Sequence, residues 1–141
     1  MEGLYRYLAD GYTCTLLRDG AVLYQSREHG VRPLLAAVDA GLDARGCTAV
    51  DNIVGRAAAL LYVYLGVAAV TAEVMSVGAR EVLAAHGIEI AARTVAAHIV
   101  NRRGDGLCPM ETATSGITDP AVALAAIRKT AAAALRAAAE K

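Results

Sequence analysis

Residues 46–80 read GCTAVDNIVGRAAALLYVYLGVAAVTAEVMSVGAR, and this stretch predicts the centre of the fold. Residues 47–50 are short, apolar and β-rich, which is typical of a central parallel strand. Residues 54–64 are apolar on nearly every side, which indicates a helix buried between the sheet and another layer. Residues 67–75 form the next strand, and the order strand, helix, strand predicts a right-handed crossover between parallel strands.

Weaker patterns surround this unit. Residues 1–9 predict a short helix, and Asp19-Gly20 predicts a hairpin turn between strands at 12–18 and 21–25. Ser76 can cap a helix that ends at Gly87, and Asp119-Pro120 can begin the last helix. The remaining predicted elements are a helix at 33–41, a strand at 88–92 and one or two helical turns at 94–100. Residues 101–116 form the longest irregular segment, and long loops of this kind are usually functional or disordered.

Length and charge limit the class of protein. A chain of 141 residues predicts one domain, residues 1–141. Fourteen basic and fourteen acidic residues balance, and no basic run favours nucleic acid as a partner. The longest uncharged run, residues 57–72, is shorter than the roughly 20 residues of a membrane span. The first residues lack the pattern of a signal peptide, so we expect a cytoplasmic protein without a membrane segment.

The three cysteines are an odd number with wide spacing, which favours reduced thiols over a disulfide framework or a zinc pair. Cys14 and Cys47 lie in predicted strands and are expected in the core. Cys108 follows Arg102 and Arg103 in the long loop, and nearby cations stabilise a thiolate. Cys108 is therefore either a reactive thiol or a cysteine that packs under the last helix.

Two turns offer candidate binding positions. In an open α/β sheet, ligands bind beyond the carboxyl ends of parallel strands. The turns at residues 51–56 and 75–80 each place a glycine near a helix start, where N–H groups and the helix dipole favour an anion. The expected ligand-binding residues are Asp51, Asn52, Gly55, Arg56, Ser76, Gly78 and Arg80. Neither turn matches a phosphate-binding motif, so both glycines could simply permit close packing.

Several acidic and histidine residues have two interpretations. Asp51 is either the N-cap of the following helix or a carboxylate that accepts hydrogen bonds from a ligand. Glu73 is either solvent-facing or a buried acid with a raised pKa, and only the buried acid would be catalytic. His29 is expected to be an exposed loop residue.

A catalytic role for Cys108 would need polar partners. Glu111 and Asp51 are the expected supporting acids, with Glu111 in the same loop as the thiol. Asn101 and Asp105 lie in that loop as well. A nucleophile also needs a base, and His98 is the nearest histidine in the sequence.

Four segments together resemble a known family: the N-terminal hairpin, VDNIVGRAAALLYVY at 50–64, AEVMSVGA at 72–79 and LCPME at 107–111. They resemble a small bacterial and archaeal domain of unknown function with a cytidine-deaminase-like fold. The similarity covers most of the chain up to about Glu111. It implies a three-layer α/β/α domain with a mixed sheet.

The resemblance also allows the zinc chemistry of deaminases to be checked. Those enzymes place a His or Cys, one residue and a catalytic Glu at one helix start, and Pro-Cys-x-x-Cys at the next. Here the first position holds Gly55-Arg56-Ala57 and the second holds residues 74–79, without a ligand at either. Cys108-Pro109-Met110-Glu111 comes too late in the chain. We therefore expect no metal and no cofactor, and zinc-dependent deamination is disfavoured.

Three functions remain open. The leading hypothesis is a metal-free, deaminase-like domain that binds a nucleotide-like or other small anionic ligand. The second is an enzyme that uses Cys108 as nucleophile or redox thiol, with Asp51 or Glu111 in support. The third is a structural or regulatory partner that forms a homo-oligomer through its apolar surface.

Overall fold

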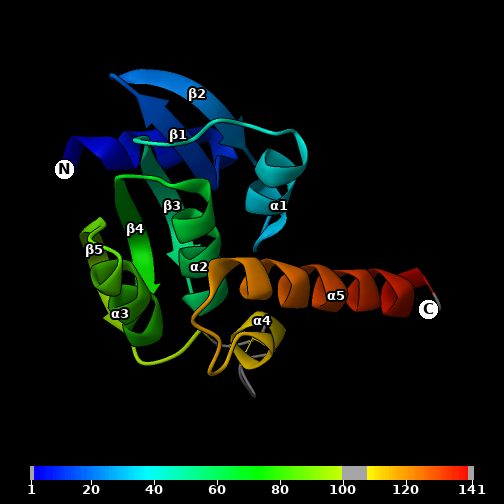
Figure 1. Ribbon diagram of the computed structural model, residues 1–141. Coiled ribbons are helices and arrows are strands. Elements are labelled where there is room, and N and C mark those ends of the chain that lie inside the picture. The colour runs from blue at the N-terminus through cyan, green and yellow to red at the C-terminus, as the bar shows by residue number, and fades with distance from the viewer. Residues whose placement is uncertain (1, 100–107, 140–141) are drawn as a thin grey trace.

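The structure, a computed structural model, describes residues 2–99 and 108–139 (Figure 1). One sheet of five strands, in the order β2-β1-β3-β4-β5, organises this part of the chain. The elements in chain order are the 3-10 helix η1 (Glu2–Gly11), β1 (Cys14–Arg18), β2 (Ala21–Ser26), α1 (Arg32–Asp39), β3 (Thr48–Val54), α2 (Arg56–Leu65), β4 (Ala69–Ser76), α3 (Val77–Ala85), β5 (Glu89–Ala96), α4 (Pro109–Ala113) and α5 (Pro120–Ala139).

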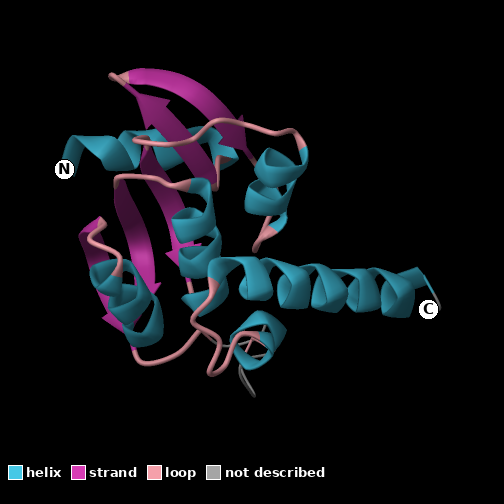
Figure 2. Cartoon of the chain, in the orientation of Figure 1, coloured by secondary structure: helices cyan, strands magenta, loops and turns pink. Residues whose placement is uncertain are grey.

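The sheet is mixed, which confirms the predicted α/β class. Strand β1 runs antiparallel to β2 and β3, whereas β3, β4 and β5 are parallel (Figure 2). The hairpin between β1 and β2 turns at Asp19 and Gly20, whose φ angles are 52° and 80°. Asp tolerates this left-handed conformation better than most residues and Gly adopts it freely, so the sequence selects the turn.

Helix α2 is the central helix of the molecule, as the apolar run predicted. Its residues Ala57–Tyr62 lack exposed positions, and it contacts α1, α3, α4 and α5. It ends at Gly66, whose φ of 79° suits the left-handed C-cap conformation. Helices α1, α2 and α3 lie together on one side of the sheet (Figure 1).

The register of the strands separates the two faces of the sheet. Cys14 and Asp51 are paired, and both side chains reach Tyr62 of α2. Thr15 is one residue further on and faces the other way, where its hydroxyl donates to the Tyr7 carbonyl at 3.1 Å. Helix η1 therefore covers the back of the sheet, and the molecule has three layers.

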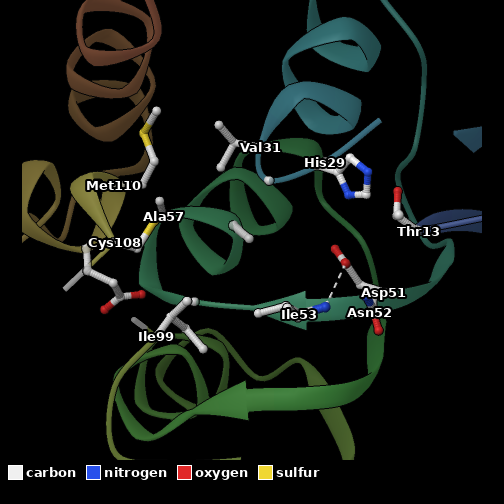
Figure 3. Close-up of a pocket in the computed structure, with 14 residues that line it drawn as sticks. Thr13, His29, Val31, Asp51, Asn52, Ile53, Ala57, Ile99, Cys108 and Met110 are labelled. Carbon is white, nitrogen blue, oxygen red and sulfur yellow. Dashed lines mark hydrogen bonds between the residues drawn. The ribbon is translucent and has the colours of Figure 1, made fainter. Parts of the chain in front are cut away.

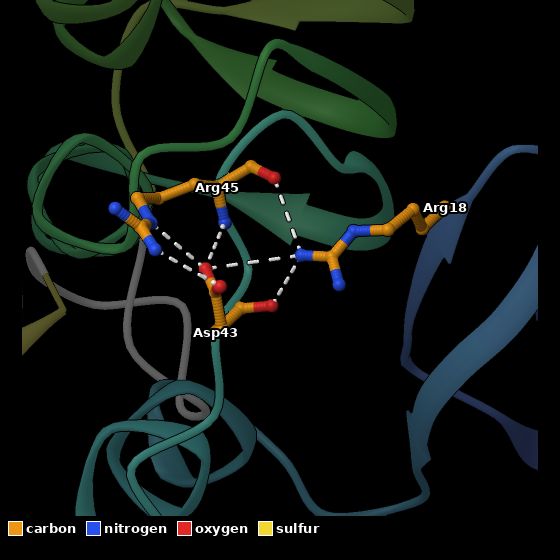
Figure 4. Close-up of polar contacts among 3 residues, drawn as sticks. All are labelled: Arg18, Asp43 and Arg45. Carbon is orange, nitrogen blue, oxygen red and sulfur yellow. Dashed lines mark hydrogen bonds and ion pairs between the residues drawn. The ribbon is translucent and has the colours of Figure 1, made fainter.

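An ion-pair cluster ties β1 to the segment before β3 at the opposite end of the strands from the carboxyl end of β3 (Figure 4). The Arg45 guanidinium donates to both carboxylate oxygens of Asp43, at 2.9 and 3.1 Å. Arg18 donates to the carbonyls of Asp43 and Arg45. The hydrogen bonds from Arg45 lower the pKa of Asp43 to about 2. The cluster is exposed, so salt screens it.

Two strands, β3 and β5, end four residues later than predicted. Strand β3 continues through Asp51 to Val54, because it pairs with β4 along this length. Gly55 is consequently the N-cap of α2, and the interpretation of Asp51 as N-cap is wrong. The helical turns predicted at 94–100 are also wrong, because β5 extends to Ala96 and pairs with β4 as far as Ser76.

The sequence predicted one irregular segment at residues 101–116, and the structure differs there. The short helix α4 lies within the segment predicted to be irregular, and Asn101, Arg102, Arg103 and Asp105 lie outside the described residues. Asp119 begins α5, since its Oδ1 accepts the Ala121 N–H at 2.8 Å. Among the described helices, none combines the length and apolar composition that crossing a bilayer requires.

Candidate functional site

A cavity of about 440 Å³ opens at the carboxyl end of β3 (Figure 3). Its floor is built by β3 and the first turn of α2. One side is formed by the residue before β1 and by the segment before α1. The other side is formed by α4 and the residues around it. The lining residues are Asp51, Asn52, Ile53, Gly55, Ala57 and Ala58 from the floor; Thr13, His29, Gly30 and Val31 from one side; and Ile99, Cys108, Met110 and Glu111 from the other.

The cavity exists because neighbouring strands end at different levels. Strand β1 begins at Cys14, opposite Asp51, and the Asn52 N–H donates to the Thr13 carbonyl at 3.0 Å just beyond that pair. Strand β3 runs on without β1 beside it. Ile53 is therefore 48% exposed although it belongs to a central strand. The uncovered end of β3 forms the floor of the cavity.

Asp51 is the buried acid of this cavity. Asp51 is 7% exposed, and the Tyr62 hydroxyl donates to its Oδ2 at 2.5 Å. The Ile53 N–H donates to Oδ1 at 3.3 Å (Figure 3). Burial raises the pKa of Asp51 to about 7, although these hydrogen bonds act in the opposite direction.

Tyr62 extends this contact to a buried thiol. Its hydroxyl lies 3.4 Å from Cys14 Sγ, so Cys14, Tyr62 and Asp51 form a chain from β1 through α2 to β3. Burial raises the pKa of both Cys14 and Tyr62. Both groups therefore stay protonated near neutral pH, and Asp51 is the member of the chain that can change charge there.

Glu111 occupies the N-terminus of α2. Its Oε1 accepts the Arg56 N–H at 2.7 Å. A Cβ added at Gly55 would lie 2.2 Å from that oxygen, so Gly55 is required for the approach. The sequence predicted that an anion would bind at this helix start, and the anion in the structure is the protein's own carboxylate.

The arginine of the same turn has a structural contact. Arg56 Nε donates to the Thr114 carbonyl at 3.1 Å, and Nη2 donates to the Ile117 carbonyl. The side chain thereby joins α2 to the connection between α4 and α5. Arg56 does not line the cavity.

The second predicted turn lies apart from the cavity. Ser76 caps α3 as predicted, because its Oγ accepts the Ala79 N–H at 3.0 Å. Gly78 follows within α3, and Arg80 is exposed. None of these three residues lines the cavity, although a Cβ added at Gly78 would lie only 4.0 Å from Arg56 Cβ in the first turn.

The cysteines divide as the sequence suggested. Cys14 and Cys47 are buried, whereas Cys108 is half-buried and lines the cavity. Cys108 and Met110 lie on the side of the cavity opposite Asp51 (Figure 3). Cys108 and Glu111, predicted as a catalytic pair, thus share a cavity with Asp51.

The histidines and Glu73 take different places. His29 is exposed, as expected, and it lines the cavity on the side of Asp51 (Figure 3). His98 is exposed and is not a lining residue. Glu73 is one-third exposed and pairs with Arg93 at 2.9 Å on the back of the sheet. The interpretation of Glu73 as a buried acid is therefore wrong.

Thr13, Val31, Ile99 and Met110 line the cavity without having been predicted. They come from four separate segments, and no local pattern marks any of them. Only a prediction of which segments meet at the end of β3 could have found them.

The residues that line the described part of the cavity limit the charge and type of a ligand. It contains the carboxyl groups of Asp51 and Glu111 and neither Arg nor Lys. Within residues 2–99 and 108–139, no group of three or more His, Cys, Asp or Glu side chains could hold a metal ion. The described part of the cavity can therefore accept hydrogen bonds and offers apolar surface.

The fold and cavity define an α/β protein with a mixed five-stranded sheet and a pocket at the end of its central strand. Residues 5–130 match the family model TM1506, described as a domain of unknown function (DUF1893), and the chain belongs to this family. A search of curated proteins gave no match.

Two solved structures from Thermotoga maritima are similar to this chain. A DUF1893 family protein is 19% identical, with a TM-score of 0.80 over 91% of this chain and 86% of that chain. That likeness shows the fold alone. A diaminohydroxyphosphoribosylaminopyrimidine deaminase/5-amino-6-(5-phosphoribosylamino)uracil reductase is 16% identical, with a TM-score of 0.46 over 73% of this chain and 34% of that chain.

Proposed function

We propose that the protein is a small-molecule-binding domain whose cavity holds a planar ligand of nucleobase size. The observation that carries the proposal is the buried Asp51 carboxyl in the wall of a cavity of about 440 Å³. Typical ligand pockets span roughly 300–1,000 Å³ and combine apolar walls with a few polar groups. Val31, Ile53, Ala57 and Met110 supply such walls, and Asp51 can accept N–H groups from the ligand.

The proposed ligand is uncharged or cationic. The sequence favoured an anion, but Glu111 already accepts the first N–H of α2, and the described lining has no Arg or Lys. We therefore propose a nucleobase-like ligand that carries no negative charge. We also propose that the site is metal-free, because Gly55, Arg56 and Ala57 stand where the deaminase pattern requires a zinc ligand and a catalytic acid.

Blocking the cavity tests this function. Ile53 is 48% exposed at the cavity floor, so Ile53→Trp can fill the site without overpacking the core. Val122 is 54% exposed on α5 and lies outside the lining, which makes Val122→Trp a matched control. Thermal shift is measured with adenine, cytosine, guanosine and cytidine. A ligand at about 100 times its Kd adds about 2.7 kcal/mol, or several degrees.

We expect at least one nucleobase or nucleoside to raise the Tm of the wild type and of Val122→Trp but not of Ile53→Trp. An equal shift in both variants would place binding elsewhere. No shift with any of the four compounds would overturn the proposal.

A second candidate function is thiol chemistry at Cys108, because this half-buried cysteine lines the same cavity as Asp51. A reactive thiolate would combine with iodoacetamide well below pH 8, where an ordinary thiol is mostly protonated. Cys108→Ser abolishes such labelling if it is specific. Slow labelling that increases only above pH 8 would remove the candidate. The three free thiols support, as part of the proposal, a reducing compartment such as the cytoplasm.

A further inference from the structure

Among residues 2–99 and 108–139, no positively charged side chain pairs with Asp51, the acid in the cavity. Its hydrogen-bond donors, the Tyr62 hydroxyl and the Ile53 N–H, are both neutral. A buried carboxylate is costly unless a cation compensates it, because the interior replaces water poorly around a charge.

We propose that the cavity is a site for a planar organic cation, of the amidinium or protonated amino-heterocycle class, whose N–H groups bind the Asp51 carboxylate. This inference rests on the proposed function and adds the charge of the ligand to it. The cation supplies the counter-charge that the described part of the chain leaves out.

The geometry around Asp51 suits such a ligand. Tyr62 binds Oδ2 from beneath, on the α2 side, so it holds the carboxyl in one orientation. Oδ1 accepts the longer contact from the Ile53 N–H, and each carboxylate oxygen can accept two hydrogen bonds. Ile53, Ala57 and Val31 provide apolar surface for a flat ring beside the acid. Tyr62 is thus a positioning residue, and Asp51 is the residue that binds.

Binding of a cation at this site is linked to a proton. Since burial raises the pKa of Asp51 to about 7, the acid is largely neutral below that pH and must ionise to pair with the ligand. The other titratable groups around it are His29 before α1, Cys14 on β1, Tyr62 on α2, and Cys108 and Glu111 at α4. Affinity should rise by about tenfold per pH unit below the midpoint and level off above it.

Three probes with one ring separate charge from shape: benzamidine is a cation, benzamide is its neutral counterpart and benzoate is the anion. Their affinities are measured by isothermal titration calorimetry at about pH 6 and about pH 8, where Asp51 is mainly neutral and mainly ionised. We expect benzamidine to bind best, with about tenfold tighter binding at the higher pH and proton release at the lower pH. Benzamide should show little pH dependence.

Variants assign the effect to Asp51. Asp51→Asn keeps the shape and an acceptor for Tyr62, and it should remove both the preference for benzamidine and its pH dependence. Glu111→Gln removes the other lining carboxylate, and His29→Gln removes the imidazole that lines the cavity. Both should keep the preference and the pH dependence. Tyr62→Phe should move the midpoint to higher pH, because it deletes a donor that favours the ionised acid.

Equal binding of benzamide and benzamidine in wild type, or unchanged behaviour in Asp51→Asn, would overturn the inference. If a neutral probe binds and Ile53→Trp blocks it, the proposed pocket stands while the cation preference fails. If none of the probes binds, the inference fails, and the nucleobase screen decides separately whether the pocket binds a ligand.

Discussion

Asp51 is buried, lines a cavity and accepts a hydrogen bond from a neutral donor, so its ionisation should have a measurable effect on the stability of the folded protein. Its pKa is raised from 3.8 to about 7 in the folded protein. Between these two values the folded state binds more protons than the unfolded state, so the free energy of unfolding falls as pH rises through this window. Above about pH 7 the effect is complete and constant.

Replacing Asp51 should therefore change how stability depends on pH. We expect the free energy of unfolding of wild type, minus that of Asp51→Asn, to fall by on the order of 4 kcal/mol from pH 4 to pH 7, from about 1.36 kcal/mol per pKa unit. Urea unfolding at several pH values measures this difference. A difference that stays constant with pH would show that Asp51 ionises normally.

Glu111 and Gly55 form a second pair whose coupling can be tested. Glu111→Ala removes the acceptor from the Arg56 N–H, and a hydrogen bond to a charged group contributes about 1.5–3 kcal/mol. Gly55→Ala should cost a similar amount, because the new Cβ takes the space of Glu111 Oε1. Since both changes break one contact, the double variant should lose clearly less than the sum. Additive losses in a double-mutant cycle would contradict this account.

At the scale of elements, Arg56 determines how α4 is attached. Its guanidinium binds the carbonyls of Thr114 and Ile117, which lie after α4, while its own backbone N–H binds Glu111 within α4. The first turn of α2 thus holds both ends of this short helix. Five residues are too few for an independently stable helix, so α4 depends on these contacts.

Arg56→Ala should accordingly loosen α4 while α2 stays folded. Hydrogen exchange measured by mass spectrometry should show faster exchange in residues 109–117, with α2 largely unchanged. Arg80→Ala is the control, since Arg80 is an exposed arginine in the first turns of α3. Equal effects of the two variants would mean that the Arg56 contacts add nothing specific.

At the scale of the whole molecule, α5 extends beyond the layer it packs on (Figure 1). Ala123, Leu124 and Ile127 are buried, but residues 132–137 are all exposed and Leu135 is 60% exposed. The first half of the helix therefore contributes to the core and the second half does not.

Deleting residues 132–141 should leave the monomer fold intact. Because the deleted residues with described side chains are exposed, we expect a Tm within a few degrees of wild type, where 1 kcal/mol corresponds to roughly 2–8 °C. Calorimetry measures this. A loss of 10 °C or more would mean that the end of α5 supports the fold, for example through contacts between copies.

The homo-oligomer expected from the sequence stays a prediction. Light scattering of the full chain should give a multiple of 14.6 kDa if copies associate. A monomer mass at micromolar concentration would contradict that expectation. Together with the deletion, the measurement separates intrinsic stability from assembly.

Much of the architecture followed from local pattern. The apolar run at 57–62 requires burial on every side, and the glycines at 20 and 66 accept left-handed φ angles at little cost. Asp19-Gly20, Ser76 and Asp119 act through neighbours a few residues away. These features are short-range, so the sequence contained enough information to predict the α/β class, the hairpin and the starts of α3 and α5.

The site depended on contacts between distant segments. Sequence reasoning selected Asp51, Asn52, Gly55, Cys108 and Glu111, and of its two interpretations of Asp51 the helix cap was wrong. Its partner Tyr62 comes from the middle of α2. Arg56 and Arg80 looked equivalent, yet only the fold directs Arg56 to the carbonyls after α4.

The sequence by itself determined which segments are strands and helices around residues 46–80, because periodicity and turn residues act locally. Only the tertiary structure decided that Glu111, 55 residues away from Arg56, binds the N-terminus of α2. It also decided that β3 extends past the start of the antiparallel strand β1, which leaves a cavity beside a buried acid. The physical reason is that a carboxylate's role depends on its burial and its partners, and both are set by segments that meet only in the folded chain.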